Sequence, residues 1–466
     1  MERIFGTDGI RGEANRPPMT VETAVAVGKA VARLWAKNNR NFIVLGKDPR
    51  LSGDMFEAAL VSGILSQGID ARTTGILPTP AVAFLAASLK AGAGIMISAS
   101  HNPFHDNGIK IFRPDGYKLS DAQEGDMEAL ILNNQPSEAP LFSGHRVGRA
   151  SPLKDAEDRY AAFLLRTFST LDLKGMKVVM DCSNGATFRV APRLFDTLGA
   201  ALECIAVTPD GKNINADCGS QHPETVSRQV IQWGADIGLA FDGDGDRLIA
   251  VDEKGRVITG DQIIAVCAMV MKKHRQLKNN TVVTTVMSNL GLCHAFKEMG
   301  IHHLMAPVGD RYVLDKMIKS GAVIGGEDSG HMIFLSHHTT GDGILTALKL
   351  IEAMQAESKP LSALADIMTV FPQALLNIPV QEKPPVDSIP EIMDAVHAAE
   401  AELGEMGRVL VRYSGTQPLC RVMVEGPTDQ ETRAHCERIA AVIQKKIGTP
   451  EPIPGSPGSA GASGTN

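Results

Sequence analysis

The chain lacks most features that mark secreted, membrane or nucleic-acid-binding proteins. Its 466 residues include seven cysteines and no C-x-x-C pair, so reduced thiols are favoured over a disulfide framework or a zinc site. No apolar stretch approaches the roughly 18 residues that a membrane span needs. The 46 basic residues are outnumbered by 53 acidic ones, and the formal charge of -7 indicates no basic surface for nucleic acid. We therefore expect a soluble, cytoplasmic protein that partners neither nucleic acid nor a membrane.

A repeated pattern runs through most of the chain. Three segments each show a short apolar strand, a polar or glycine-containing turn, an amphipathic helix and a second strand. They are FIVLGKDPRLSGDMFEAALVSGILSQGIDA, KVVMDCSNGATFRVAPRLFDTLGAAL and TVVTTVMSNLGLCHAFKEMGIHHL. This alternation is typical of a largely parallel sheet with helices on its faces. The sequence therefore predicts the α/β class, with three related α/β domains and mixed, largely parallel sheets.

The spacing of the three copies sets the expected domain boundaries. It places the α/β domains at residues 1–150, 151–255 and 256–367. After them, two helical patterns flank two strands, which predicts a smaller α+β domain at 368–448. The remaining residues, 449–466, are rich in Pro, Gly and Ser and contain no aromatic residue. Such a segment buries too little apolar surface to order itself, so we expect a disordered tail.

A cluster of carboxylates, AFDGDGDRLIAVDE, places Asp242, Asp244 and Asp246 at alternate positions. Three carboxylates this close repel one another, and hard oxygen ligands without nearby His or Cys favour Mg²⁺ or Ca²⁺. One alternative is an EF-hand, but Arg247 stands where its sharp turn requires Gly, and the flanking segments read as strands. A solvated acidic turn is the other alternative. The sequence predicts a magnesium site, with a phosphate near it.

The stretch ISASHNPFHDNGIK follows the apolar run GAGIM. Pro103 pushes the residue before it out of the helical region and Gly108 loosens the chain again, so Ser100 and His101 are expected on an irregular loop. Adjacent Ser and His residues do not form a catalytic dyad, and the G-x-S-x-G elbow of hydrolases is missing. By itself Ser100 could be an ordinary turn residue.

A third loop, VRYSGTQPLCR, combines two guanidiniums, two hydroxyls and a glycine. Arginine offers bidentate donors to phosphate, and a glycine exposes backbone amides that form an anion nest. The candidate phosphate ligands are Arg412, Ser414, Gly415, Thr416 and Arg421. Taken alone, the segment could equally be an ordinary hairpin loop.

A fourth loop, GGEDSGH, places Glu327, Ser329 and His331 among glycines after a short strand. These side chains suit the binding of sugar hydroxyls. A glycine-rich turn with polar residues that have no ligand is the alternative.

Six motifs together resemble those of the α-D-phosphohexomutases. In chain order they are FGTDGIRG, SASHNP, DGDGDR, PVGDRYV, GGEDSGH and RYSGTQP. Their order and separations match the family over nearly the whole chain except the tail. The resemblance implies four domains around a central cleft, with one site loop from each domain.

The resemblance also implies a phosphoenzyme. Ser100 matches the family's phosphoserine, which lends a phosphoryl group to the substrate. One Mg²⁺ per chain would be held by Asp242, Asp244, Asp246 and an oxygen of phospho-Ser100. Glucosamine 1,6-bisphosphate would serve as the intermediate and primer.

The other site residues follow from the same match. Lys110 matches the general acid/base, and we expect it to accept a proton only if desolvation leaves it partly neutral; a surface or phosphate-pairing lysine is the alternative. Arg11 and Arg247 are candidate clamps on the phosphoryl group, and His101 is expected to support the loop. The loop containing Arg412 would hold the phosphate that does not react, and the GGEDSGH loop would bind sugar hydroxyls.

Within the family, the motifs most resemble the branch that acts on glucosamine phosphate. The implied partner is a hexosamine phosphate, and we expect a monomer or a homodimer. Two residues depart from that branch, Asp328 where Gln is usual and Gln417 where Glu is usual. Alternatives are a phosphomannomutase/phosphoglucomutase activity, a Ca²⁺-binding module and a catalytically silent sugar-phosphate sensor.

Overall fold

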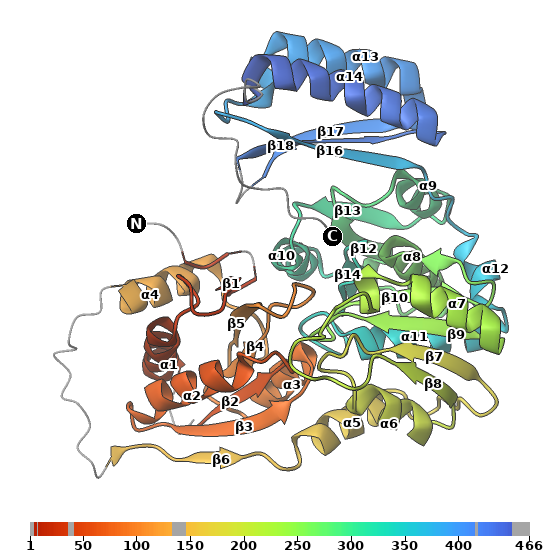
Figure 1. Cartoon of the computed structure of the whole chain (residues 1–466). Helices are drawn as coiled ribbons and strands as arrows, with labels where there is room; N and C mark the ends of the chain where they lie inside the picture. The colour runs from red at the N-terminus through yellow and green to blue at the C-terminus, as the bar shows by residue number, and fades with distance from the viewer. Residues whose placement is uncertain (1–3, 7, 36–41, 133–145, 415–417, 450–466) are drawn as a thin grey trace. The chain divides into compact units, whose positions relative to one another are not determined.

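The computed structural model describes residues 4–6, 8–35, 42–132, 146–414 and 418–449 (Figure 1). Four sheets with their helices divide between two compact units. The larger unit ends at Met368 and contains the first three sheets, and the smaller unit contains the fourth sheet together with the short stretch 289–291. The expected tail lies outside the described residues except for its first position.

The first sheet has six strands in the order β1-β5-β4-β2-β3-β6. Strand β2 is parallel to β3 and β4, and β3 is parallel to β6, whereas β5 is antiparallel to both of its neighbours. The strands are β1 (Ile10–Glu13), β2 (Phe42–Lys47), β3 (Asp70–Ile76), β4 (Gly94–Ile97), β5 (Asp106–Phe112) and β6 (Ala150–Pro152). The helices are α1 (Val21–Trp35), α2 (Gly53–Leu65), α3 (Thr79–Ser88) and α4 (Asp121–Leu132).

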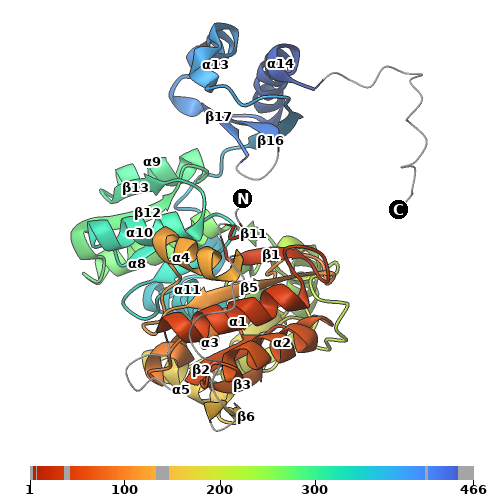
Figure 2. The same cartoon turned by 90° about the vertical axis from the view of Figure 1, so that its left-hand side faces the viewer.

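Helices α1 and α2 pack side by side against this sheet (Figure 2). Glycines allow their close approach: a Cβ on Gly28 would lie 2.4 Å from the carbonyl oxygen of Leu60, and one on Gly63 would lie 2.3 Å from that of Val25. Any larger residue at either position would force the helices apart.

The second sheet has the order β11-β10-β9-β7-β8, and β7 is parallel to β8 and β9. Strand β10 is antiparallel to β9, so the two form a hairpin. The strands are β7 (Lys177–Asp181), β8 (Ala201–Ile205), β9 (Ile237–Phe241), β10 (Leu248–Asp252) and β11 (Val257–Ile258). The helices are α5 (Ala156–Thr167), α6 (Val190–Thr197) and α7 (Glu224–Trp233).

The third sheet has the order β13-β12-β14-β15. Strand β12 is parallel to β13 and β14, and β15 returns antiparallel to β14. The strands are β12 (Thr281–Thr285), β13 (His302–Ala306), β14 (Ile324–Gly326) and β15 (Met332–Phe334). The helices are α8 (Gly260–Lys273), α9 (Leu290–Glu298), α10 (Asp310–Ser320), α11 (Gly343–Glu357) and α12 (Leu361–Ala365).

The three repeats found in the sequence are real structural units. They fold as β2-α2-β3, β7-α6-β8 and β12-α9-β13, and each joins two parallel strands. A continuous apolar core links the three sheets, since Leu85 beside the first, Phe241 in the second and Val282 in the third belong to one buried cluster. The predicted α/β class is confirmed.

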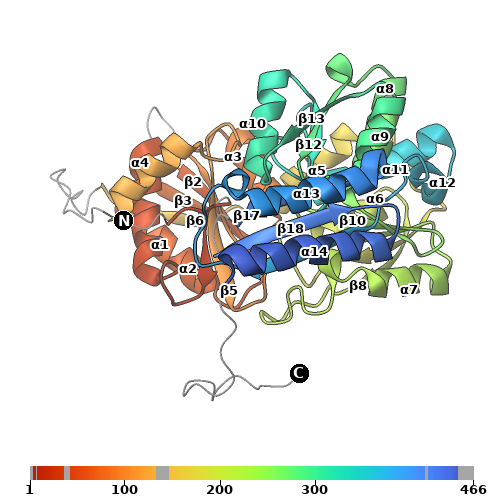
Figure 3. The same cartoon turned by 90° about the horizontal axis from the view of Figure 1, so that it is seen from above.

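The smaller unit is an antiparallel sheet in the order β16-β18-β17, covered on one face by two helices (Figure 3). Its elements are β16 (Gln373–Pro379), α13 (Pro390–Leu403), β17 (Arg408–Tyr413), β18 (Leu419–Glu425) and α14 (Asp429–Ile447). Thr428 caps α14 by accepting a hydrogen bond from the amide of Glu431, and lysines occupy the last turn. The expected α+β domain is therefore formed.

No helix among the described residues is both long enough and apolar enough to cross a membrane. All seven cysteines are free thiols, as the sequence predicted, and five of them are buried.

Candidate active site

Each sheet of the larger unit contains the same feature, a strand of its parallel part followed in the chain by a strand antiparallel to it. The pairs are β4/β5, β9/β10 and β14/β15. The loops between them, residues 98–105, 242–247 and 327–331, are the SASHNP, DGDGDR and GGEDSGH motifs. Because strands flank the aspartates, the EF-hand alternative is wrong.

Ser100 lies just after β4 and is buried. Its Oγ donates a hydrogen bond to Oδ2 of Asp242 at 2.5 Å, and its amide donates to Oγ of Ser98 at 2.9 Å. The backbone of Ser100 adopts φ 53°, in the left-handed region that non-glycine residues rarely enter. The predicted loop thus presents its hydroxyl to the predicted metal site.

The three aspartates of the DGDGDR loop form a compact buried cluster. Asp242, Asp244 and Asp246 each offer an oxygen, and these oxygens all lie within 4.8 Å of one another. In the described part of the chain, the Oδ1 atoms of Asp244 and Asp246 have no hydrogen-bond partner. Buried, unpaired carboxylate oxygens fit the needs of a hard cation such as Mg²⁺. The solvated acidic turn is therefore wrong.

The pKa values of two of the aspartates are shifted in opposite directions. Burial, followed by the charges of Asp246 and Asp244, raises the pKa of Asp242 well above its usual value. Burial also opposes the ionisation of Asp246, but Lys110 and His331 hold the pKa of Asp246 well below its usual value. Added positive charge would favour the ionised form of Asp242.

Lys110 on β5 is buried among these carboxylates. Its Nζ lies 2.8 Å from Asp244, 3.2 Å from Asp246 and 2.9 Å from Asp8. Burial would lower the pKa of Lys110, but the three carboxylates raise it well above its usual value. In this arrangement the condition for proton acceptance, a partly neutral lysine, is opposed by the surrounding carboxylates. Because Lys110 is buried, the surface-lysine alternative is wrong.

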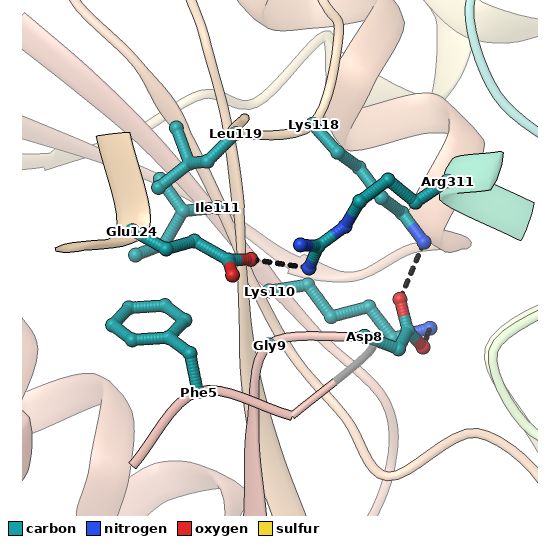
Figure 4. A pocket seen from close by; sticks show the side chains of 9 residues that line it. All are labelled: Phe5, Asp8, Gly9, Lys110, Ile111, Lys118, Leu119, Glu124 and Arg311. Carbon is teal, nitrogen blue, oxygen red and sulfur yellow. Dashed lines mark hydrogen bonds and ion pairs between the residues drawn. The ribbon is translucent and has the colours of Figure 1, made fainter. Parts of the chain in front are cut away.

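A chain of ion pairs continues from Lys110 across the larger unit (Figure 4). Asp8 pairs with Lys110 and with Lys118, and Lys118 also pairs with Asp310 at the start of α10. Close by, Arg311 pairs with Glu124 at 2.6 Å. The sequence analysis assigned no role to the partners of Lys110 in this chain, although Asp8 and Asp310 stand inside the quoted FGTDGIRG and PVGDRYV motifs.

The candidate phosphoryl clamps lie near the carboxylates. Arg11 pairs with Asp8 at 3.0 Å, and Arg247 lies 3.9 Å from Asp246 with its side chain 21% exposed. His101 is partly buried, and burial together with the two arginines lowers its pKa to about 4. A neutral imidazole at this position agrees with a supporting role.

The GGEDSGH loop positions its polar residues differently from one another. Glu327 accepts a hydrogen bond from the amide of Gly309 at 3.0 Å. The Oγ of Ser329 is buried and has no hydrogen-bond partner in the described residues. His331 is buried, with its two ring nitrogens each 3.6 Å from a carboxylate oxygen, of Asp246 and of Asp310. It therefore contacts one carboxylate of the aspartate cluster, Asp246, whereas the sequence placed it among the sugar ligands.

Asp328 lies on the surface of the same loop and faces the start of α8. Its carboxylate accepts a hydrogen bond from the amide of Asp261 at 3.2 Å. A negative charge at a helix N-terminus is favourable. This departure from the family pattern therefore has a local structural explanation and supplies no argument about the sugar.

In the smaller unit, Arg412 on β17 stands directly opposite Arg421 on β18. Burial, then the neighbouring Arg421, lowers the pKa of Arg412. Lys383, which sequence reasoning missed, donates to the carbonyl of Ser414 at 2.7 Å and adds a third cation. Such a grouping of positive charges suits an anion. Three predicted or queried positions, Gly415, Thr416 and Gln417, lie outside the described residues.

Family models cover almost the whole chain. The models of phosphoglucomutase/phosphomannomutase alpha/beta/alpha domains I, II and III match residues 2–138, 158–255 and 259–371, and the C-terminal domain model matches 375–442.

Two full-length relatives are both phosphoglucosamine mutases. That of Syntrophus aciditrophicus is 55% identical to this chain over 451 residues, and that of Syntrophobacter fumaroxidans is 55% identical over 450 residues. Each alignment covers 96% of this chain and 100% of the relative.

Solved structures share the fold. A phosphoglucomutase/phosphomannomutase family protein from Burkholderia thailandensis superposes with a TM-score of 0.78 at 24% identity, covering 95% of this chain and 97% of its own. The N-acetylphosphoglucosamine mutase of Aspergillus fumigatus, solved with GlcNAc-6P and magnesium, gives 0.67 at 16% identity, with 95% of each chain covered.

Proposed function

The chain belongs to the phosphoglucomutase/phosphomannomutase family, and we propose that it interconverts glucosamine 6-phosphate and glucosamine 1-phosphate. The reaction class is that of a phosphohexomutase, an isomerase that moves a phosphoryl group between two hydroxyls of one sugar. One observation supports the site assignment above the others: the Ser100 hydroxyl lies 2.5 Å from Asp242 inside a buried carboxylate cluster.

In the first half-reaction, phospho-Ser100 donates its phosphoryl group to the free hydroxyl of the sugar monophosphate. The bond from phosphorus to Ser100 Oγ breaks, and a bond from phosphorus to the sugar oxygen forms, giving glucosamine 1,6-bisphosphate. The sugar hydroxyl loses a proton and Ser100 Oγ gains one. That proton then makes the hydrogen bond to Asp242 that the structure contains.

In the second half-reaction, the bisphosphate turns around and returns its other phosphoryl group to Ser100. Ser100 Oγ loses its proton and forms a bond to that phosphorus, the bond from phosphorus to the sugar oxygen breaks, and the sugar oxygen takes up a proton. The product is the isomeric monophosphate, and the phosphoenzyme is restored. No external phosphate donor is consumed in the cycle.

Positive charge is the main requirement of this chemistry, because phosphoryl transfer depends mostly on positioning and charge neutralisation. Mg²⁺, held by Asp242, Asp244 and Asp246, would neutralise charge on the transferring group. Lys110 adds a fixed cation beside the same carboxylates. It remains the candidate for relaying the proton, although its raised pKa favours the cationic role.

The remaining site residues bind substrate. Arg11 and Arg247 would contact the transferring phosphoryl group, and Arg412, Ser414 and Arg421 the phosphate that does not react. Glu327 and the unpaired hydroxyl of Ser329 would bind sugar hydroxyls. His331 supports Asp246 from behind.

The substrate assignment is tested by a competition among sugars. Enzyme primed with glucose 1,6-bisphosphate is assayed with glucosamine, glucose and mannose 6-phosphates, and kcat/KM is compared. We expect glucosamine 6-phosphate to be preferred at least tenfold, about 1.4 kcal/mol in transition-state binding. If glucose or mannose phosphate is preferred by that margin, the chain is a phosphoglucomutase or phosphomannomutase and the phosphoserine mechanism survives. Absence of turnover with all three would contradict the mutase assignment itself.

A further inference from the structure

Two side chains from different domains hold the same two carbonyl groups of the Ser100 loop. Nη2 of Arg50 donates to the carbonyl oxygens of Ser100 and Asn102, both at 2.8 Å. Nδ2 of Asn215 donates to the same two oxygens, at 2.9 Å and 3.0 Å. The carbonyl groups of Ser100 and Asn102 therefore each accept two hydrogen bonds, one from Arg50 and one from Asn215.

Arg50 is itself fixed from behind. Its Nε donates to Oδ2 of Asp48 at 2.9 Å, and that oxygen also accepts a hydrogen bond from Ser98 Oγ at 2.5 Å. Nη1 donates to two further carbonyls, that of Pro103 in the loop and that of Asp106 at the start of β5. The side chain of Arg50 is completely buried, so all of its hydrogen-bond donors are directed by the protein.

Asn215 approaches from the segment between β8 and α7, in the second sheet's domain. The backbone amide of Asn215 donates to the carbonyl of Ser183 at 2.9 Å, and this bond anchors Asn215 within that domain. Gly243 leaves the room that this contact needs. A Cβ there would lie 2.6 Å from the carbonyl oxygen of Ser100 and 2.8 Å from Nδ2 of Asn215.

We propose that Arg50 and Asn215 are positioning residues that fix the left-handed backbone of Ser100, so that Oγ keeps its direction toward Asp242. A φ of 53° is unfavourable for serine and persists only where its surroundings impose it. Neither side chain makes a described contact with Ser100 Oγ or the carboxylate cluster. Their contacts are with main-chain carbonyls, so they act on Ser100 through its backbone.

This inference rests on the proposed role of Ser100 as phosphoryl carrier, and the contacts indicate which rate it affects. Phosphoryl transfer requires the reacting oxygen in line with phosphorus, and a displacement of about 1 Å can cost roughly 100-fold. Substrate binding depends on other loops. Loss of the contacts from Arg50 or Asn215 should therefore lower kcat and leave KM nearly unchanged.

The test compares two asparagines of one loop. Asn215→Ala removes the contacts to Ser100 and Asn102, whereas Asn213→Ala removes only contacts to Thr208 and Asp210 within its own loop. We expect N215A to lower kcat roughly 10- to 100-fold with KM changed less than about twofold. N213A should keep kcat within about twofold, even if it lowers the melting temperature more.

Two further measurements separate the possible failures. Arg50→Lys keeps the charge and loses the planar fork, so we expect a kcat loss at least as large as for N215A. Mass spectrometry of each protein after incubation with glucose 1,6-bisphosphate reports phosphate on Ser100 without requiring turnover. A parent enzyme that is phosphorylated and active, with N215A equal to it in kcat, would overturn the inference. Equal losses in N213A and N215A would do the same, and a parent that never gains phosphate on Ser100 would overturn the proposed function as well.

Discussion

The Oγ of Ser100 lies 2.5 Å from Oδ2 of Asp242, although the two residues are 142 positions apart in the chain. Ser100 lies in the loop after β4 of the first sheet, and Asp242 directly follows β9 of the second sheet. The same contact therefore joins two domains and joins the candidate nucleophile to the candidate metal site. Substitution of either Ser100 or Asp242 should reduce catalytic activity strongly and change the stability of the fold much less.

Ser100→Ala should remove nearly all mutase activity while leaving the melting temperature within a few degrees, because one buried hydrogen bond contributes only about 1 kcal/mol. Phosphopeptide mapping of the parent should locate the label on Ser100. As a control, Ser98→Ala removes a hydroxyl from the same loop and should slow the enzyme while leaving the label on Ser100. A phosphate found elsewhere, or normal turnover by S100A, would refute the assignment.

Asp244→Asn should weaken Mg²⁺ binding and slow phosphoryl transfer by roughly 100-fold or more, because a countercharge is lost where phosphate charge is neutralised. Isothermal titration with Mg²⁺ and assays after EDTA treatment measure the two effects. Asp252→Asn is the matched control, since Asp252 is a buried carboxylate paired with Arg256 outside the cluster. Full activity in EDTA, or identical Mg²⁺ titrations for parent and D244N, would contradict the metal site.

Local patterns in the sequence were sufficient for the fold. The strand-helix-strand units and the helices and strands of the α+β unit depend on patterns of nearby residues, and these signals are periodic. The DGDGDR and SASHNP loops were found for the same reason, because each is a compact motif. The structure adds the finding that both occur where a parallel strand turns into an antiparallel one.

Long-range pairing could not be predicted in the same way. Lys118 pairs with Asp310 across 192 positions, and Lys110 with Asp244 across 134. Nothing in the sequence near Lys110 indicates the three carboxylates around its ammonium group, so the sequence could not show that they raise its pKa. Arg50 stands in the first repeat, where only its helix-and-strand pattern was interpreted.

The ion pair between Arg311 and Glu124 should show energetic coupling. Arg311 lies in the first turn of α10 and Glu124 belongs to α4, so the pair joins the third domain to the first. Both side chains are mostly buried. A double-mutant cycle with R311A, E124A and the double variant should give a coupling energy of about 1 kcal/mol or more in unfolding free energy. The same variants should raise KM more than they lower kcat, because α10 follows Gly309, which binds Glu327. Strictly additive effects would show that the pair contributes nothing.

The last prediction concerns pH and the buried carboxyl of Asp342. This residue caps α11, accepting hydrogen bonds from the amide of Leu345 at 3.0 Å and from the hydroxyl of Tyr160 at 2.8 Å. Burial raises its pKa from 3.8 to about 6. The folded state therefore binds this proton more tightly than the unfolded state. The protonated carboxyl of Asp342 makes its full contribution to the free energy of unfolding below about pH 4, and this contribution is lost as the pH rises through about 6.

Asp342→Asn removes the titration and keeps a side-chain oxygen for the cap. As the pH rises from 4 to 6, we expect the free energy of unfolding of D342N, relative to the parent, to increase by up to about 3 kcal/mol. Denaturant unfolding at several pH values measures this difference. The nearby titration of His338, whose pKa burial lowers to about 4, is common to both proteins and cancels.

Tyr160→Phe provides a control with a predicted direction of its own. The Tyr160 hydroxyl lowers the pKa of Asp342, so its loss should move the window of pH dependence upward. If the difference between D342N and the parent is flat from pH 4 to 6, Asp342 is ionised throughout that range. Its charge would then be stabilised by the helix N-terminus more strongly than burial opposes it.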